Sequence, residues 1–181
     1  MKVKGMMLSA LFAAVTAVLA QISVPIPVSA VPFSLGIVGV FLSGALLGRK
    51  EALISQLIYI LLGVVGLPVF SQFRGGFSVL AGPTGGYLFV YPVMALLISA
   101  ICVKAKKRSF PVLVVSMLPA LALCYVAGSL WLAFMSGITV PAAFAAGALP
   151  FIVPDCIKIV LSSLLAAALY KALKKQLNYQ A

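Results

Sequence analysis

The chain has no histidine, and only two of its 181 residues are acidic. Histidine is the commonest general base and metal ligand in proteins. The two acids, Glu51 and Asp155, are far apart in sequence, so a site built on paired carboxylates would have to join distant segments. The three cysteines show no CxxC spacing and are interpreted as small apolar fillers. No phosphate-binding GxxxxGK[ST] loop occurs either. These absences argue against an enzyme and against a bound metal or cofactor.

Charge is also scarce, whereas apolar residues dominate. Only 8% of the residues are charged and 64% are hydrophobic. Soluble domains are usually about 45–50% apolar and about a quarter charged. The composition therefore indicates an integral membrane protein. Because lipid leaves backbone polar groups no partner outside the chain, long apolar runs predict helices, and the fold class is all-α.

The apolar residues form six runs that together make a single membrane domain over residues 1–181. A spanning helix needs roughly 17–25 residues, so each run can cross, although the third is short. The predicted spans are 6–24, 31–48, 52–67, 83–103, 110–135 and 150–170.

Basic residues orient these spans. Eleven of the thirteen lie in four clusters that six spans would bring to one side: Lys2, Lys4; Arg49, Lys50; Lys104, Lys106, Lys107, Arg108; Lys171, Lys174, Lys175. The positive-inside rule makes that side, and both termini, cytoplasmic. The net charge of +11 is thus interpreted as a record of topology and an attraction to anionic lipid, not as a nucleic-acid-binding surface.

The remaining charged residues, Arg74, Asp155 and Lys158, fall on the predicted outer side. Asp155 and Lys158 are three residues apart, which places them on one helix face. Charges in a spanning helix are costly against lipid, so the pair should point into the bundle or a cavity. Two interpretations stay open. The pair either neutralises itself as a structural ion pair, or it contacts a polar ligand with Arg74 as a third participant.

The stretch GPTGGY at residues 82–87 opens the fourth run on the same side. Proline suits the first turn of a helix, where amides lack internal partners, and glycine lets a ligand approach those amides closely. The alternative is a tight turn with small residues for helix packing. The candidate ligand contacts are Thr84, Gly85, Gly86 and Tyr87. In other runs, Gln56 and Tyr59 could face the site or a neighbouring helix, Tyr125 has no assigned role, and Trp131 is expected to anchor the interface.

The first run carries two overlapping pairs of small residues spaced by four. Such stripes allow close helix contact, either inside the bundle or with another membrane protein. The candidate partner-binding residues are Ala10, Ala13, Ala14 and Ala17.

Two motifs, RGGFSVLAGPTGGYL at residues 74–88 and PDCIK at 154–158, resemble the BioY family. Members of that family are biotin-binding S components of energy-coupling factor (ECF) transporters. The resemblance continues in ALFAAVTAV at 10–18, VPFSLG at 31–36 and GVVGLPVF at 63–70. Pro154 stands where the family pattern leads us to expect glycine.

The resemblance implies a six-helix bundle in the plasma membrane of a prokaryote, with a biotin pocket near its outer end. It also implies a transmembrane coupling protein (T component), docking at Ala10 and Ala14, and two cytoplasmic ATPases. Asp155 would accept from the ureido N–H groups of biotin, while Lys158, Arg74 or bare amides would serve its oxygens. Phe73, Phe77 and Tyr87 would supply apolar walls. Independently of the resemblance, the proline-rich loop at 23–31 faces the same predicted side, so we expect it to act as a lid. The alternatives are an S component for another vitamin, a biotin transporter that acts without ATPases, or an assembly subunit.

Overall fold

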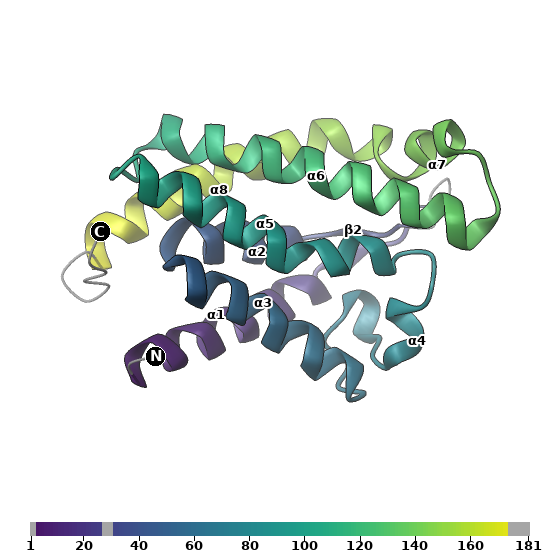
Figure 1. The fold of residues 1–181 in the computed structure, drawn as a ribbon, viewed down its shortest axis with the longest axis horizontal. Helices are drawn as coiled ribbons and strands as arrows, with labels where there is room; N and C mark the ends of the chain where they lie inside the picture. Colours follow the sequence, from purple (N-terminus) through teal and green to yellow (C-terminus); the bar gives the residue numbers. More distant parts are fainter. Residues whose placement is uncertain (1–2, 27–30, 174–181) are drawn as a thin grey trace.

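The computed structural model describes residues 3–26 and 31–173, and helices make up most of this part of the chain (Figure 1). The main helices are α1 (Val3–Gln21), α2 (Gly36–Leu46), α3 (Arg49–Val64), α5 (Gly85–Lys104), α6 (Phe110–Ser136) and α8 (Ile152–Leu173). The shorter elements are η1 (Ser71–Phe73), α4 (Phe77–Leu80), α7 (Val140–Gly147), η2 (Leu149–Phe151) and the antiparallel strands β1 (Ser23–Val24) and β2 (Phe33–Ser34). The main helices lie along one long axis, and each reverses the direction of the one before (Figure 1).

Four stretches of the described chain are long and apolar enough to cross a membrane: Val3–Gln21, Gly85–Lys104, Phe110–Ser136 and Val140–Ala172. The helices α2 and α3 are shorter, with 11 and 16 residues. At about 1.5 Å per residue, α2 rises only about 16 Å, against about 30 Å for a bilayer core. The protein is therefore a helical membrane protein in which α2 is about half a span.

The second predicted run, 31–48, differs most from the structure. Residues 31–35 are not helical, and α2 begins only at Gly36. Pro32 explains part of this difference, because a proline disfavours helical geometry in the residue before it and offers no N–H of its own. The third run starts earlier than predicted, since α3 already begins at Arg49 behind an extended Gly48.

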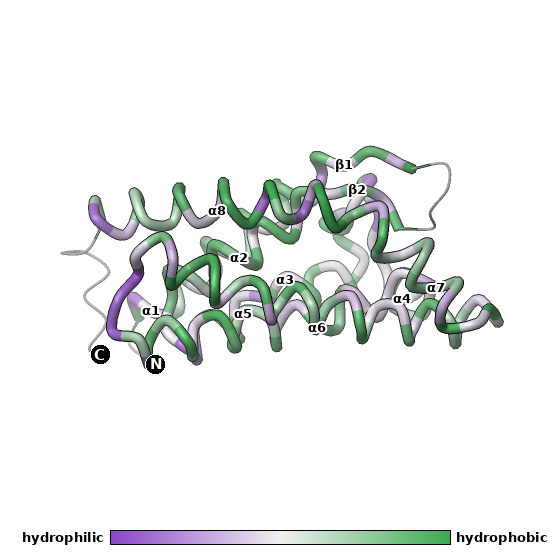
Figure 2. The backbone as a smooth tube through the Cα atoms, turned by 90° about the horizontal axis from the view of Figure 1, so that it is seen from above, coloured by the Kyte–Doolittle hydropathy of each residue, from purple (hydrophilic) through white to green (hydrophobic). Residues whose placement is uncertain are grey.

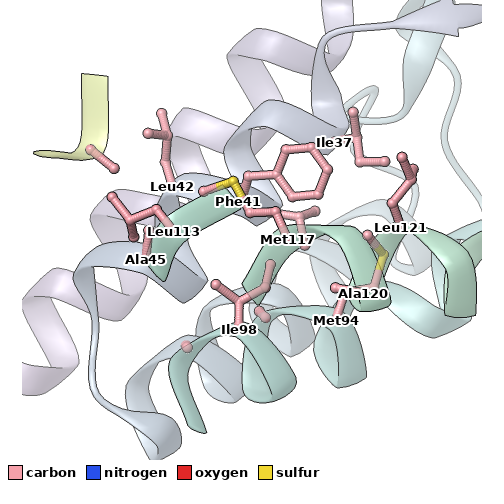
Figure 3. Close-up of a cluster of buried hydrophobic side chains, with 14 of the residues drawn as sticks. Ile37, Phe41, Leu42, Ala45, Met94, Ile98, Leu113, Met117, Ala120 and Leu121 are labelled. Atoms are coloured by element: carbon pink, nitrogen blue, oxygen red, sulfur yellow. The ribbon is translucent and has the colours of Figure 1, made fainter. Parts of the chain in front are cut away.

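The core is built around α2, which packs on α1, α5 and α8. Figure 3 shows Phe41 of α2 beside Met117 of α6 and Ile37 of α2 beside Leu121 of α6, in one cluster with Met94 and Ile98 of α5. All of α2 is buried apart from Val38, which is half-buried. A helix that is apolar all round belongs in the interior of a bundle.

The two ends of the bundle differ in polarity. One end holds the start of α1, the α2–α3 and α5–α6 connections and the end of α8, and it includes the most hydrophilic stretch of the tube (Figure 2). The predicted basic clusters meet at this end, although Lys2, Lys174 and Lys175 lie outside the described residues. The other end holds β1, β2, α4 and α7, and we call it the strand end (Figures 1 and 2).

Candidate functional site

At the strand end, a cavity of about 60 Å³ lies between the segment at 31–37 and the helices α5, α6 and α8. We call it the acidic cavity because Asp155 is the acid in its lining. It is lined by Val31, Pro32, Ser34, Ile37, Tyr87, Tyr91, Cys124, Tyr125, Gly147, Phe151, Asp155 and Lys158. The predicted residues Asp155, Lys158 and Tyr87 are thus brought together.

The carboxylate of Asp155 is buried, with 5% of the residue exposed. Its Oδ1 lies 2.8 Å from Nζ of Lys158, and its Oδ2 accepts a hydrogen bond of 2.7 Å from the hydroxyl of Tyr125. Within the described residues, Oδ1 accepts no well-aligned hydrogen bond besides this ion pair. A carboxylate has about four lone-pair sites, so Asp155 keeps acceptor capacity toward the cavity.

Lys158 holds the extended segment in place. Its ammonium donates to the carbonyl oxygen of Ser34 at 2.8 Å and lies 3.8 Å from the centroid of the Phe33 ring. It therefore connects the acid on α8 to the segment at 31–35, which lines the cavity. The pair points inward, as the spacing predicts, and it is linked to more than itself.

Tyr87 stands in a slot formed by two glycines. A Cβ on Gly128 would approach the Tyr87 ring to 2.2 Å, and one on Gly147 would approach its hydroxyl oxygen to 2.1 Å. The same hydroxyl donates to the carbonyl oxygen of Gly147 at 3.0 Å. Side chains at either position would displace the Tyr87 ring, which lines the acidic cavity.

The second cavity, of about 70 Å³, shares Val31, Pro32, Ser34, Tyr87 and Tyr91 with the first. It adds the predicted residues Arg74 and Thr84, so we call it the arginine cavity. The two cavities adjoin at the shared segment at 31–35 and at the rings of Tyr87 and Tyr91.

Other predicted contacts lie away from both cavities. Phe73 and Phe77 are on the surface, with 71% and 66% of each residue exposed, and they line neither cavity in this structure, so their role as pocket walls stays a prediction. Gln56 is fully buried between helices, where its Nε2 donates to Thr16 and Ser43. Tyr59, which could have faced the site, instead packs against other rings in the interior.

The glycines of residues 82–87 serve packing in this structure. A Cβ on Gly85 would meet the carbonyl oxygen of Leu80 at 1.8 Å, and one on Gly86 would meet the Trp131 side chain at 2.2 Å. The amide of Gly85 is hydrogen-bonded to the carbonyl of Gly82. Trp131 also donates to that carbonyl, at 2.9 Å. The helix start is therefore filled by the protein, contrary to the expectation of bare amides facing a ligand.

The predicted alanine stripe divides into two faces. Ala13 is buried and Ala17 half-buried, whereas Ala10 and Ala14 are exposed. Only the exposed pair is accessible to another protein in this conformation.

Several lining residues had no predicted role, notably Ser34, Tyr91, Tyr125 and Phe151. One of them carried a usable signal. Tyr91 lies four residues after Tyr87, so both stand on one face of a helix. The contact of Tyr125 with Asp155 joins residues 30 apart on different helices, and nothing in the local sequence marks it.

Comparison with known proteins shows that the sequence profile described as the BioY family matches residues 1–175. The chain belongs to the BioY family. A protein of Pyrococcus horikoshii named "Probable biotin transporter BioY" is 41% identical over 93% of this chain and 98% of its own. The "Biotin transporter BioY" of Thermotoga maritima is 40% identical over 89% of this chain and 92% of its own. BioY relatives are thus named as transporters, not as enzymes.

The fold has a close counterpart among solved structures. A crystal structure of the S-component for biotin from an ECF-type ABC transporter matches with a TM-score of 0.88. It is 30% identical in sequence, and the match covers 94% of this chain and 92% of that one. The BioY fold therefore extends over essentially the whole chain.

Proposed function

We propose that this protein captures biotin at the strand end of the bundle and serves as the substrate-specific S component of an ECF-type ABC transporter. The observation that carries the proposal is the buried group of Asp155, Lys158 and Tyr125 in a chain whose relatives are named biotin transporters. Binding of a substrate does not require a cluster of catalytic groups. It needs a shaped cavity with a few polar groups.

The chemistry of biotin fits this group. Its ureido ring offers two N–H donors and one carbonyl acceptor, and its tail ends in a carboxylate. The free acceptor capacity of Asp155 suits an N–H donor, and Lys158 suits an oxygen. Arg74, at the other cavity, is the cation that remains for the second oxygenated end. Ring stacking on Tyr87 and Tyr91, which line both cavities, would serve the apolar parts.

The same proposal includes the setting of the protein. We expect six crossings of a prokaryotic plasma membrane, with both termini and the basic end in the cytoplasm. The alternating directions of the six main helices and the separation of charge between the two ends support this topology. The partners would be a T component, contacting the exposed face of α1 at Ala10 and Ala14, and two ATPases.

Equilibrium binding of radiolabelled biotin to the purified chain tests the proposal. We expect saturable binding at micromolar or lower concentration, which excess biotin reverses and other vitamins do not. Displacement by a different vitamin would point to that vitamin as the substrate. Absence of biotin binding at micromolar concentration would refute the proposal.

The substitution Tyr125→Phe probes the acidic cavity with little change of shape. It removes the hydroxyl that donates to Oδ2 of Asp155. A hydrogen bond to a charged group contributes about 1.5–3 kcal/mol, so we expect biotin affinity to fall by at least about tenfold. Calorimetric titration measures the change. Tyr170→Phe, at the opposite end, is the matched control and should bind as the wild type does.

A disulfide can test whether the segment at 31–35 must move. Of the predicted lid at 23–31, residues 27–30 lie outside the described residues. The β1 strand is joined to β2, and the hydroxyl of Ser23 accepts from the amide of Gln72 at 3.1 Å. A Ser23→Cys/Gln72→Cys pair, made in a Cys156→Ala background, should tether β1 to η1. Because β1 pairs with β2, the tether should also restrain the segment at 31–35.

We expect the oxidised tethered protein to exchange bound biotin at least about tenfold more slowly than its reduced form, as for other gated sites. A filter assay of radiolabel release measures this rate, with the two single cysteine variants as controls. Equal exchange in the oxidised and reduced forms would show that the segment at 31–35 does not gate the site.

A further inference from the structure

The basic end of the bundle contains a cavity of about 370 Å³, larger than either cavity at the strand end. It lies between the α2–α3 connection, the α5–α6 connection and Tyr170 of α8. Its cationic lining residues are Arg49, Lys50, Lys106, Lys107 and Arg108, and we call it the basic cavity. Biotin capture at the other end uses none of them.

The charge of the basic cavity is not compensated within the described residues. Five cations face one acid, Glu51. Across residues 3–26 and 31–173, the one ion pair within 4.0 Å is that of Asp155 and Lys158, at the opposite end. The lining therefore carries more positive than negative charge, which favours the binding of an anion in the cavity.

Arg108 forms a fixed wall of this cavity. Its guanidinium donates to the carbonyl oxygens of Ala45 and Leu47 at the end of α2. It also lies 5.1 Å from the centroid of the Tyr170 ring. Burial lowers the pKa of this guanidinium, because its charge is poorly hydrated. A positive charge that is held in place and short of water gains most from an anionic neighbour.

Lys106 occupies an unusual backbone position beside Arg108. Its φ is +53°, just after the end of α5, and its amide donates to the carbonyl of Val103. Glycine is the usual residue at such a helix end, since other L-residues are disfavoured there. A lysine at this place gives up backbone stability and presents an ammonium at the rim of the cavity.

The lining is also partly apolar, with Cys102, Val103 and Tyr170 beside the cations. The cavity opens at the end of an apolar bundle, where the surface of a membrane would lie. Anionic phospholipids at such a surface attract basic groups, and arginine binds phosphate oxygens with paired N–H groups. A lipid headgroup, with its phosphate joined to an apolar tail, suits a lining of both kinds.

We propose that the basic cavity binds the phosphate of an anionic phospholipid headgroup, and that the bound lipid connects the α2–α3 and α5–α6 connections. A free phosphate ion shares the chemistry but lacks the tail that would use the apolar part of the lining. An acidic segment of a partner protein is the competing occupant.

Native mass spectrometry of the full chain with added phosphatidylglycerol or phosphatidylcholine tests this proposal. The cavity variant is Lys106→Gly/Lys107→Ala. The control is Lys104→Ala/Lys171→Ala, which removes the same charge from exposed residues of the same end that do not line the cavity. We expect phosphatidylglycerol affinity to fall at least about tenfold in the cavity variant and less than about twofold in the control.

Each other outcome is informative. Equal losses in both variants, or equal binding of the two lipids by the wild type, would overturn the proposal by showing diffuse attraction only. Unchanged affinity in the cavity variant would also overturn it and would favour an acidic protein partner. Displacement by inorganic phosphate at concentrations similar to those of the lipid would identify free phosphate as the occupant.

Two further measurements separate this proposal from folding and from the proposed function. The melting temperature of the cavity variant should not fall, since glycine relieves the backbone of position 106. Biotin binding, measured on the same samples, should be equal in both variants and the wild type. Failure of all three proteins to bind biotin would refute the proposed function and leave the lipid result standing.

Discussion

Replacement of Asp155 by alanine is expected to weaken biotin binding by at least about 30-fold, because truncation of one partner of a buried charged contact costs 2–5 kcal/mol. The carboxylate has two roles that alanine cannot fill. It accepts from Tyr125 and pairs with Lys158, and it retains acceptor capacity toward the cavity. Equilibrium binding of radiolabelled biotin measures the loss.

The neighbouring residue Cys156 offers a matched control for this experiment. It lies on the same turn of α8, but its side chain is exposed on the outside of the bundle. Cys156→Ala should bind biotin as the wild type does. A folded Asp155→Ala protein with wild-type affinity would show that biotin binds elsewhere.

Removal of Lys158 is expected to cost both stability and binding. In Lys158→Met, the carboxylate of Asp155 stays buried without a counter-charge, and breaking a buried pair in this way costs about 3–5 kcal/mol. We expect a lower melting temperature in detergent, together with loss of biotin binding. The extended segment also loses the hydrogen bond to the carbonyl of Ser34.

The double variant Asp155→Asn/Lys158→Met separates these two effects. Replacing both members of a buried ion pair is often close to neutral for folding, so the melting temperature should recover toward the wild-type value. Biotin binding should stay lost, because the carboxylate and the ammonium that would contact the ligand are both absent. Recovery of binding together with stability would mean that the pair is structural, which is the first of the two interpretations that the sequence leaves open.

The sequence was sufficient for features that depend on local spacing. Asp155 and Lys158 are three residues apart on one helix, and lipid is a poor solvent for both, so their inward direction followed from position alone. The helical class followed in the same way, from the length of the apolar runs. Ser34, by contrast, meets Lys158 across 124 residues of sequence, and no local pattern encodes that contact.

Other site predictions depend on packing that the sequence does not encode. Phe73 and Phe77 were expected to wall the pocket because the ring and tail of biotin need apolar contacts, but both are exposed in this structure, and an apolar side chain in a membrane protein can also face outward. Glycines at 85 and 86 were expected to leave room for a ligand. The same absence of a side chain makes room for Leu80 and Trp131. Whether a glycine leaves space for a ligand or for a neighbouring residue can be decided only from the packed structure.

The half-length of α2 has a consequence for the size of the substrate. Where α2 begins at Gly36, its long neighbours α1, α5 and α8 continue along the bundle, so about 14 Å of the length that a spanning helix would fill is left to the extended segment at 31–35. An extended chain is thinner than a helix, whose diameter is about 10 Å, so replacing helix by extended chain leaves space between the neighbouring helices. The acidic and arginine cavities, which share this extended segment, are thus associated with the shortening of one helix. We expect a space as wide as the missing helical turns to suit a small ring system with a narrow tail, as in the proposed substrate. Extension of α2 by a single turn is expected to fill that space.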